Sequence, residues 1–195
     1  MATHPTTKKK IVVFDLDETV ADLKGFILPH LNMRAGTNFT DLTHFNWEEQ
    51  FNLPRAELQQ VLIDQQYMMH LKLRSGMIKY WFEALRINKW TVHFSTHRAH
   101  LPFAHEMTKM WLDSYPFLKH EKLMILHPDQ RKADHFSPAT CLYFDDSAKE
   151  VEYAQSKGIK SWLIQQPWNM HSEHPHVCKS IEDVQCAIQW ARGPT

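Results

Sequence analysis

The sequence predicts an α/β protein with a Rossmann-like, three-layer parallel sheet and a small α-helical cap inserted after the first strand. Short apolar runs alternate with helical patterns along most of the chain, and polar residues directly follow several of these runs. The long stretch of residues 22–73 departs from this alternation. Because strands that alternate with helices imply right-handed crossovers, we expect parallel pairing. Residues 1–21 and 74–195 should form the core, and residues 22–73 the cap.

The composition is that of a globular protein. Of the 195 residues, 43% are hydrophobic, and Lys+Arg and Asp+Glu balance at 22 each, so bulk charge favours neither disorder nor a nucleic-acid coat. The three cysteines lack Cys-x-x-Cys spacing, which argues against a disulfide framework and favours a reducing, cytoplasmic setting. The apolar run after Lys10 is too short for a signal peptide or a membrane span, so no membrane partner is expected.

The expected elements follow from apolar patterning. The first strand, residues 11–14, is a continuous β-branched and aromatic run, typical of a strand covered on both faces. Further strands are expected over residues 90–94, 123–126, 141–144 and 160–164. Core helices are expected after Ser75, which would be an N-cap residue, over residues 101–112, from Ser147 to Lys157 and over residues 180–191. In the cap, Pro29 should kink or shorten a first helix, and Pro54 suits the first turn of another.

Paired acidic residues follow two of the predicted strands. Asp15 and Asp17 come directly after the first strand, and side chains two apart in an extended chain point to the same side. Two like charges held so close need a cation or a shared proton, so this pair predicts a divalent metal, a reacting acid, or both. Asp145 and Asp146 repeat the pattern after the fourth strand. Open α/β sheets place their ligand sites at these strand ends.

Four motifs in this order resemble those of the haloacid dehalogenase superfamily of phosphohydrolases: FDLDET, FSTHR, DQRKAD and YFDDS. Within it, the sequence is most similar to the 5'(3')-deoxyribonucleotidases, with further hints in VADLKGF, SGMIKYWFEAL and QQPWN. Glu18 stands where many members have glycine, which narrows the backbone geometry of that turn.

The resemblance implies a role for each motif. Asp15 is the expected nucleophile, which forms an aspartyl-phosphate, and Asp17 the general acid and base. Thr96, with Ser95 as the alternative, would hold the phosphoryl group, and Lys132, with Arg131 as the alternative, would neutralise charge. The expected cofactor is Mg²⁺, bound by Asp15, Asp17, Asp145 and Asp146, and which of the last two contacts the metal directly is left open.

Substrate contacts are expected from the second motif and from the cap. His97 and Arg98 would approach the phosphate or the substrate. In the family an aromatic pocket in the cap stacks the nucleobase, and Phe26, Phe45, Trp47 and Phe51 are available for this, although packing between cap and core explains Phe45, Trp47 and Phe51 equally well. Leu23 and His70 stand where aromatic residues are expected, so base preference stays open.

The favoured function is therefore a Mg²⁺-dependent phosphomonoesterase, a 5'-nucleotidase that acts on (deoxy)nucleoside monophosphates. The alternatives are a polynucleotide end phosphatase, another small-metabolite phosphatase, and a non-catalytic nucleotide-binding module. The expected partner is a small phosphorylated metabolite rather than a stably bound nucleic acid, and a homodimer is left open. A last group, His171, His174, His176 and Cys178, favours a solvated loop over a soft-metal site.

Overall fold

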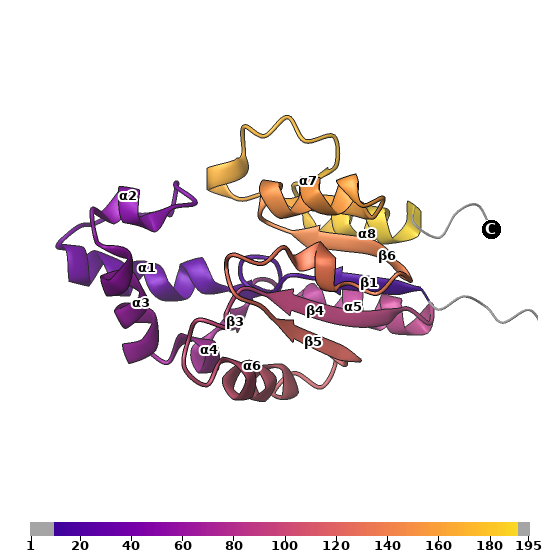
Figure 1. The fold of residues 1–195 in the computed structure, drawn as a ribbon, viewed down its shortest axis with the longest axis horizontal. Coiled ribbons are helices and arrows are strands. Elements are labelled where there is room, and N and C mark those ends of the chain that lie inside the picture. Colours follow the sequence, from indigo (N-terminus) through magenta and orange to yellow (C-terminus); the bar gives the residue numbers. More distant parts are fainter. Residues whose placement is uncertain (1–9, 191–195) are drawn as a thin grey trace, which may run out of the picture.

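The computed structural model describes residues 10–190, the side chains of residues 181, 182, 189 and 190 excepted, and confirms the predicted α/β fold. A parallel sheet with the strand order β5-β4-β1-β6-β7-β8 forms the centre of the molecule (Figure 1). Its strands are β1 (Ile11–Phe14), β4 (Thr91–Thr96), β5 (Lys122–Ile125), β6 (Thr140–Asp145), β7 (Lys160–Ile164) and β8 (Val177–Cys178). The last of these was not predicted, because two residues directly after the His- and Pro-rich stretch 171–176 carry no strand pattern.

Helices cover both faces of this sheet. They are α5 (Ile78–Ile87), α6 (Ala104–Asp113), α7 (Ala148–Ser156) and α8 (Ile181–Trp190), with short 3-10 helices η1 (Lys132–His135) and η2 (Pro167–Asn169). Val12 and Phe14 of β1 enter an apolar cluster that includes residues of α5, α6 and α8, whereas Ile11 and Val13 enter another that includes Ala154 of α7. Alternate residues of β1 are thus buried on opposite faces, as its continuous apolar run predicted.

The segment expected to form the cap is helical. It contains α1 (Leu23–Ala35), α2 (Trp47–Phe51), α3 (Arg55–Asp64) and α4 (Tyr67–His70). Figure 1 shows α1, α2 and α3 beyond one end of the sheet strands. A small antiparallel pair, β2 (Ala21–Asp22) with β3 (Lys72–Leu73), joins the two ends of the segment. The two places where the chain enters and leaves residues 22–73 therefore lie side by side.

Three helix predictions need correction. The helix α1 runs through Pro29 and is not shortened there, because Ile27 and Leu31 are fully buried on either side of it. Ser75 is not the N-cap of α5, which is Met77; Ser75 Oγ instead accepts a hydrogen bond from the Met77 N–H (3.2 Å). The helix α6 begins at Ala104 rather than at residue 101, since Phe103 before it takes a left-handed conformation (φ 54°).

One further property follows from the helix lengths and compositions. Within residues 10–190, none of the helices combines the length and the apolar character that crossing a bilayer requires.

Candidate active site

The acidic strand ends meet at one place. The chain passes from β1 to β4 on one side and returns through β6 on the other, so the carboxyl end of β1 lies at the switch point where α/β sheets bind ligands. A cavity of about 290 Å³ opens there. Of the predicted site residues, it is lined by Asp15, Asp17, Phe45, Trp47, Thr96, His97, Lys132, Asp145 and Asp146. Phe26 and Arg98 are not among its lining residues.

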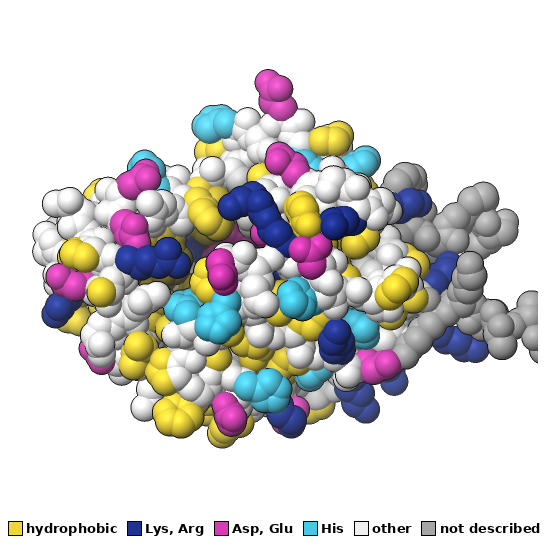
Figure 2. All heavy atoms as spheres, in the orientation of Figure 1, with side chains coloured by type: hydrophobic (Ala, Val, Ile, Leu, Met, Phe, Trp, Pro, Cys, Tyr) yellow, Lys and Arg dark blue, Asp and Glu magenta, His cyan; other side chains and the backbone are white. Residues whose placement is uncertain are grey.

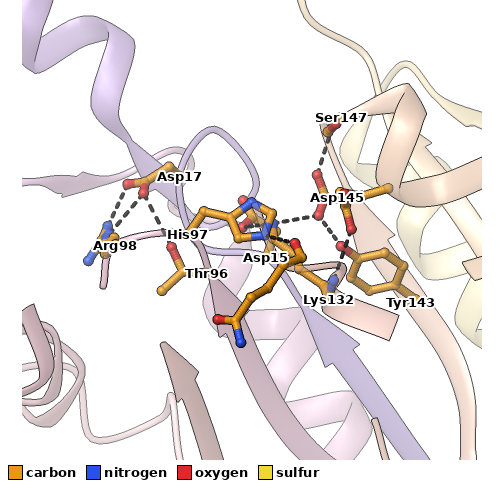
Figure 3. A network of polar contacts seen from close by, with 11 residues as sticks. Asp15, Asp17, Thr96, His97, Arg98, Lys132, Tyr143, Asp145 and Ser147 are labelled. Atoms are coloured by element: carbon orange, nitrogen blue, oxygen red, sulfur yellow. Dashed lines mark hydrogen bonds and ion pairs between the residues drawn. The ribbon is translucent and has the colours of Figure 1, made fainter. Parts of the chain in front are cut away.

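Lys132 bridges the two acidic motifs. Its Nζ lies 2.6 Å from Asp15 Oδ1 and 2.7 Å from Asp145 Oδ2, and all three side chains are buried (Figure 3). The hydroxyl of Tyr143 donates to Asp145 Oδ2, and the N–H of Ser147 donates to Asp145 Oδ1 (2.7 Å). The Asp145 carboxylate is thus fixed from three directions.

The 3-10 helix η1 explains why Lys132, and not Arg131, reaches the cavity. The N–H of Lys132 donates to Glu150 Oε2 (3.0 Å), and Arg131 Nη1 pairs with Glu150 Oε1 (3.0 Å). The guanidinium of Arg131 also lies over the Tyr153 ring, 5.1 Å from its centre. Glu150 therefore holds both neighbours so that only the lysine faces the acidic cluster.

Three carboxylates could hold a divalent cation. Oxygen atoms of Asp15, Asp145 and Asp146 all lie within 4.8 Å of one another. Burial raises the pKa of Asp15 to about 8, with Lys132 opposing the rise and Asp145 adding to it. Burial, with Asp145 and Asp15 nearby, also raises the pKa of Asp146 well above its ordinary value. Because Lys132 supplies a single positive charge to this buried set, a hard cation with oxygen ligands fits it.

The His/Cys group is not brought together in the same way. Among the described residues, the three aspartates form the only cluster of three or more His, Cys, Asp or Glu groups with ligand atoms close enough for one metal. Cys178 lies buried in β8, and the His174 ring bonds the His176 carbonyl (3.0 Å).

Asp17, a half-buried residue of the cavity lining, pairs with the buried Arg98. Arg98 Nε donates to Asp17 Oδ2 (2.9 Å) and Arg98 Nη2 to Asp17 Oδ1, while Arg98 Nη1 donates to Thr108 Oγ1 (3.1 Å). The Arg98 side chain is 1% exposed, and its guanidinium lies 5.3 Å from the centre of the Tyr67 ring. We expected Arg98 to contact substrate; the structure places it behind Asp17, where all three of its guanidinium nitrogens have partners.

The hydroxyl motif presents Thr96 to the site. Thr96 Oγ1 lies 3.5 Å from Asp17 Oδ2 and lines the cavity (Figure 3). Successive strand residues point to opposite faces, so the neighbouring Ser95 side chain is buried away from the cavity lining. His97 also lines the cavity, where its Nε2 bonds the Gln130 carbonyl (2.9 Å). Burial, with Lys132 nearby, lowers the pKa of His97.

Aromatic residues form another part of the lining. Phe45 and Trp47 come from the cap segment, and Trp168 comes from η2. The Phe45 and Trp168 rings meet edge to face at 6.5 Å, and Phe45 is 65% exposed. Phe26 packs instead against the rings of His30 (5.2 Å) and His70 (6.3 Å).

Sequence reasoning missed several lining residues: Glu18, Leu23, Pro128, Ser147, Lys149, Glu150 and Trp168. The QQPWN motif pointed toward Trp168 without assigning it a role. The same motif supports both acidic loops, since Gln166 Nε2 donates to the Glu18 carbonyl (2.7 Å) and Asn169 Nδ2 to the Asp146 carbonyl (2.8 Å).

The fold and this site define a haloacid dehalogenase-like phosphatase. A predicted phosphatase from Clostridium acetobutylicum superposes with a TM-score of 0.66 at 13% identity, over 94% of this chain and 100% of that one. A haloacid dehalogenase-like hydrolase from Streptococcus pneumoniae gives 0.62 at 15% identity, over 95% and 100%. A phosphoglycolate phosphatase-like protein from Lactobacillus delbrueckii gives 0.65 at 14%, over 93% and 99%. At these identities the likeness shows the fold.

The family model for "5' nucleotidase, deoxy (Pyrimidine), cytosolic type C protein" matches residues 9–193. The chain belongs to this family, and it is a phosphoric monoester hydrolase of the 5'-nucleotidase type. A comparison with curated proteins found no match.

Proposed function

We propose that this protein is a Mg²⁺-dependent 5'-nucleotidase that hydrolyses (deoxy)nucleoside monophosphates through an aspartyl-phosphate on Asp15. The observation that carries the proposal is a single cavity whose lining joins the Asp15, Lys132 and Asp145 cluster to Phe45 and Trp168. Such a cavity accommodates a phosphate at one end and a flat aromatic base at the other.

The chemistry divides between Asp15 and Asp17. Asp15 attacks the phosphorus and takes up the phosphoryl group, while the leaving ribose oxygen receives a proton from Asp17. A water molecule then attacks the phosphoryl group on Asp15 and gives its proton to Asp17, which releases phosphate and restores both carboxyls. The bond from Arg98 holds the Asp17 carboxylate at the edge of the cavity, which fixes where these proton transfers occur.

The other residues neutralise and position the phosphoryl group. Lys132 balances charge on Asp15 and on the phosphoryl oxygens, and Thr96 donates its hydroxyl to one of them. A divalent cation on Asp15, Asp145 and Asp146, when bound, offsets the charge of the phosphate and lets these buried carboxylates ionise. Lys149 in the first turn of α7 adds a second positive charge to the lining.

Aromatic residues of the cap segment and of η2 choose the substrate. The rings of Phe45, Trp47 and Trp168 hold the base by stacking and edge contacts. On the face shown in Figure 2, Lys and Arg side chains are interspersed with Asp and Glu rather than gathered in a stripe, which supports a mononucleotide over a polynucleotide end.

The test is a phosphate-release assay with and without Mg²⁺ over the deoxy- and ribonucleoside 5'-monophosphates, their 3'-phosphates and sugar phosphates. We expect Mg²⁺-dependent release with the 5'-nucleotides ranked first. Asp15→Asn should abolish turnover, while Asp64→Asn on the exposed face of α3 leaves it unchanged. No release from any nucleotide, or a wild-type rate in Asp15→Asn, would refute the proposal.

A further inference from the structure

A second cavity, of about 330 Å³, shares no lining residue with the active-site cavity. It lies where the strands β7 and β8 end and where the helices α5 and α8 begin. Thr19 from the catalytic turn and Arg74 from the segment after β3 also line it. The cavity therefore lies beside the two segments through which the chain enters and leaves the cap.

Two buried polar groups belong to residues that line this cavity. Thr19 is 0% and Trp81 4% exposed, and neither Thr19 Oγ1 nor Trp81 Nε1 has a hydrogen-bond partner among the described residues. Most buried polar groups in proteins are hydrogen-bonded, so a hydroxyl and an indole N–H without partners call for a ligand or water. The remaining buried lining is largely apolar, from Ile78, Ile164 and Val184.

The rim of the cavity is cationic. Arg74 and Lys179 are exposed, and neither forms an ion pair with a described side chain. Arg74 Nη2 donates to the Gln165 carbonyl (3.2 Å), which holds its guanidinium near the end of β7. Ser75 and Ser180 add hydroxyls, and no Asp or Glu is among the lining residues.

The helix α5 adds to the positive potential. It has ten residues, and its first one, Ile78, lies in the cavity wall. Ser75 already accepts the N–H groups of Met77 (Oγ, 3.2 Å) and Ile78 (carbonyl, 3.2 Å), so this helix N-terminus offers an anion mainly its partial positive charge. At α8 the nearby Asp183 carboxylate already accepts the N–H groups of Lys179 and Ser180 (2.8 and 2.9 Å). The N-terminus of α8 therefore adds less positive potential to the cavity than that of α5.

We propose that this cavity is a second binding site, which takes a small phosphate-bearing ligand. Its phosphoryl oxygens would lie between the side chains of Arg74 and Lys179, with Thr19 and Trp81 as further donors. This site is independent of the proposed nucleotidase activity, since none of these residues lines the active site.

A ligand bound in this cavity would contact both the core and the segments beside β2 and β3, through which the chain enters and leaves the cap. Thr19 lies two residues before β2 and Arg74 directly follows β3, and the N–H of Arg74 donates to the Val20 carbonyl (2.9 Å). Lys179 and Ser180 lie at the far edge of the sheet, after β8. A ligand held between these two parts restrains the segments through which the chain enters and leaves the cap.

The test is a titration of inorganic phosphate into metal-free protein, followed by calorimetry and ³¹P NMR, because without metal no bound cation holds phosphate at the active site. We expect saturable binding that Arg74→Gln weakens about tenfold and Thr19→Val about threefold, since charged hydrogen bonds exceed neutral ones. Lys179→Gln serves as a second charge variant, and Lys72→Gln, exposed in β3 outside the cavity, should bind as wild type does. A nucleoside monophosphate titrated in parallel tells a free phosphate from a phosphate ester by its relative affinity.

Hydrogen exchange supplies a readout that activity does not affect. Phosphate should slow exchange in peptides that span residues 17–24 and 70–78 of the wild-type protein, and should leave them unchanged in Arg74→Gln. Absence of saturable binding, or binding that the Arg74, Lys179 and Thr19 variants leave at wild-type strength, would overturn the proposal.

Discussion

Arg98 holds the carboxylate of Asp17 with two nitrogens, Nε at 2.9 Å from Oδ2 and Nη2 on Oδ1. The two residues are 81 positions apart, and they come from the carboxyl ends of neighbouring strands β1 and β4. The guanidinium is fully buried and is itself fixed by Thr108. The planar guanidinium of Arg98 thus sets the orientation of the Asp17 carboxylate, which is proposed to transfer protons both when the phosphoryl group moves to Asp15 and when water releases it.

The first prediction concerns this guanidinium. Arg98→Lys keeps the charge but cannot make two parallel hydrogen bonds, so we expect kcat to fall about 10- to 100-fold, with a smaller change in KM. This is less than the roughly 100- to 10,000-fold that general acid–base catalysis contributes, because Asp17 itself remains. Steady-state kinetics with a nucleoside monophosphate measure both. The matched control is Arg34→Lys, which changes an exposed pair with Glu57 in the cap and should leave kcat unaltered. Equal losses in both variants would show that the Arg98 guanidinium has no special role.

The second prediction concerns protons at the aspartate cluster. In the metal-free protein burial raises the pKa of Asp15 from 3.8 to about 8, so this carboxyl is largely protonated at pH 7. A divalent cation requires the carboxylate, and its binding should therefore release about one proton from Asp15 at pH 7 and fewer at pH 9, in addition to any proton from Asp146, whose pKa is also raised. Calorimetry in buffers of different ionisation enthalpy measures this number. Asp15→Asn should lower it, and heats at pH 7 that do not depend on the buffer would contradict the expectation.

The fold was predictable because its evidence is local. Residues 11–14 form an unbroken apolar run, and such a run bounded by polar residues can be read without knowing what covers it. Gly158 does take the left-handed conformation (φ 81°) expected after its helix. The strand β8 escaped prediction since Val177–Cys178 is stabilised by pairing with residues of β7 that lie 14 positions away in sequence, rather than by its own pattern.

The site was predictable where reactive side chains stand at the ends of strands. Asp15 and Asp145 end strands that are neighbours in the sheet, so their adjacency follows from topology. The partner of Arg98 could not be read in the same way, because burial of its guanidinium decides which carboxylate it meets. Nor does spacing tell which cap aromatics face inward: Phe45 lines the cavity, whereas Phe26 packs on His30 and His70.

The third prediction tests the aromatic part of the cavity. Removal of the ring in Phe45→Ala should raise KM for a nucleoside monophosphate about 5- to 150-fold with little effect on kcat, because stacking of a base on an aromatic ring contributes about 1–3 kcal/mol. Folding should be unaffected since Phe45 is 65% exposed. Trp168→Phe, which keeps a ring but loses the indole N–H, should show a smaller rise. The control is Tyr80→Ala, an aromatic on α5 that is 60% exposed and lies outside the site.

A KM effect that also appears with a sugar phosphate would contradict this assignment. Such a substrate has no base to stack, so the Phe45 and Trp168 variants should treat it as the wild type does. Comparison of the two substrates in one variant therefore separates loss of stacking from a general change in the cavity.

The last prediction concerns Glu18, which directly follows Asp17 in the chain. It takes a left-handed conformation (φ 59°) and is 4% exposed, and its carboxyl accepts the N–H of Lys24 at the start of α1. Burial raises the pKa of Glu18 from 4.5 to about 7, with the Lys24 hydrogen bond opposing the rise. Because the folded value exceeds the unfolded one, ionisation costs stability: the cost is absent below pH 4.5, grows with pH, and is complete above pH 7.

Glu18→Gln keeps an acceptor for the Lys24 N–H and removes the ionisation. Its melting temperature relative to the wild type should therefore rise between pH 5 and pH 8, with most of the change complete by pH 7. Thermal unfolding of metal-free protein at several pH values measures this difference. The control Glu152→Gln alters an exposed carboxyl on α7 and should give a difference that stays constant with pH. A constant difference for Glu18→Gln as well would mean that this carboxyl ionises equally easily in the folded and unfolded chains.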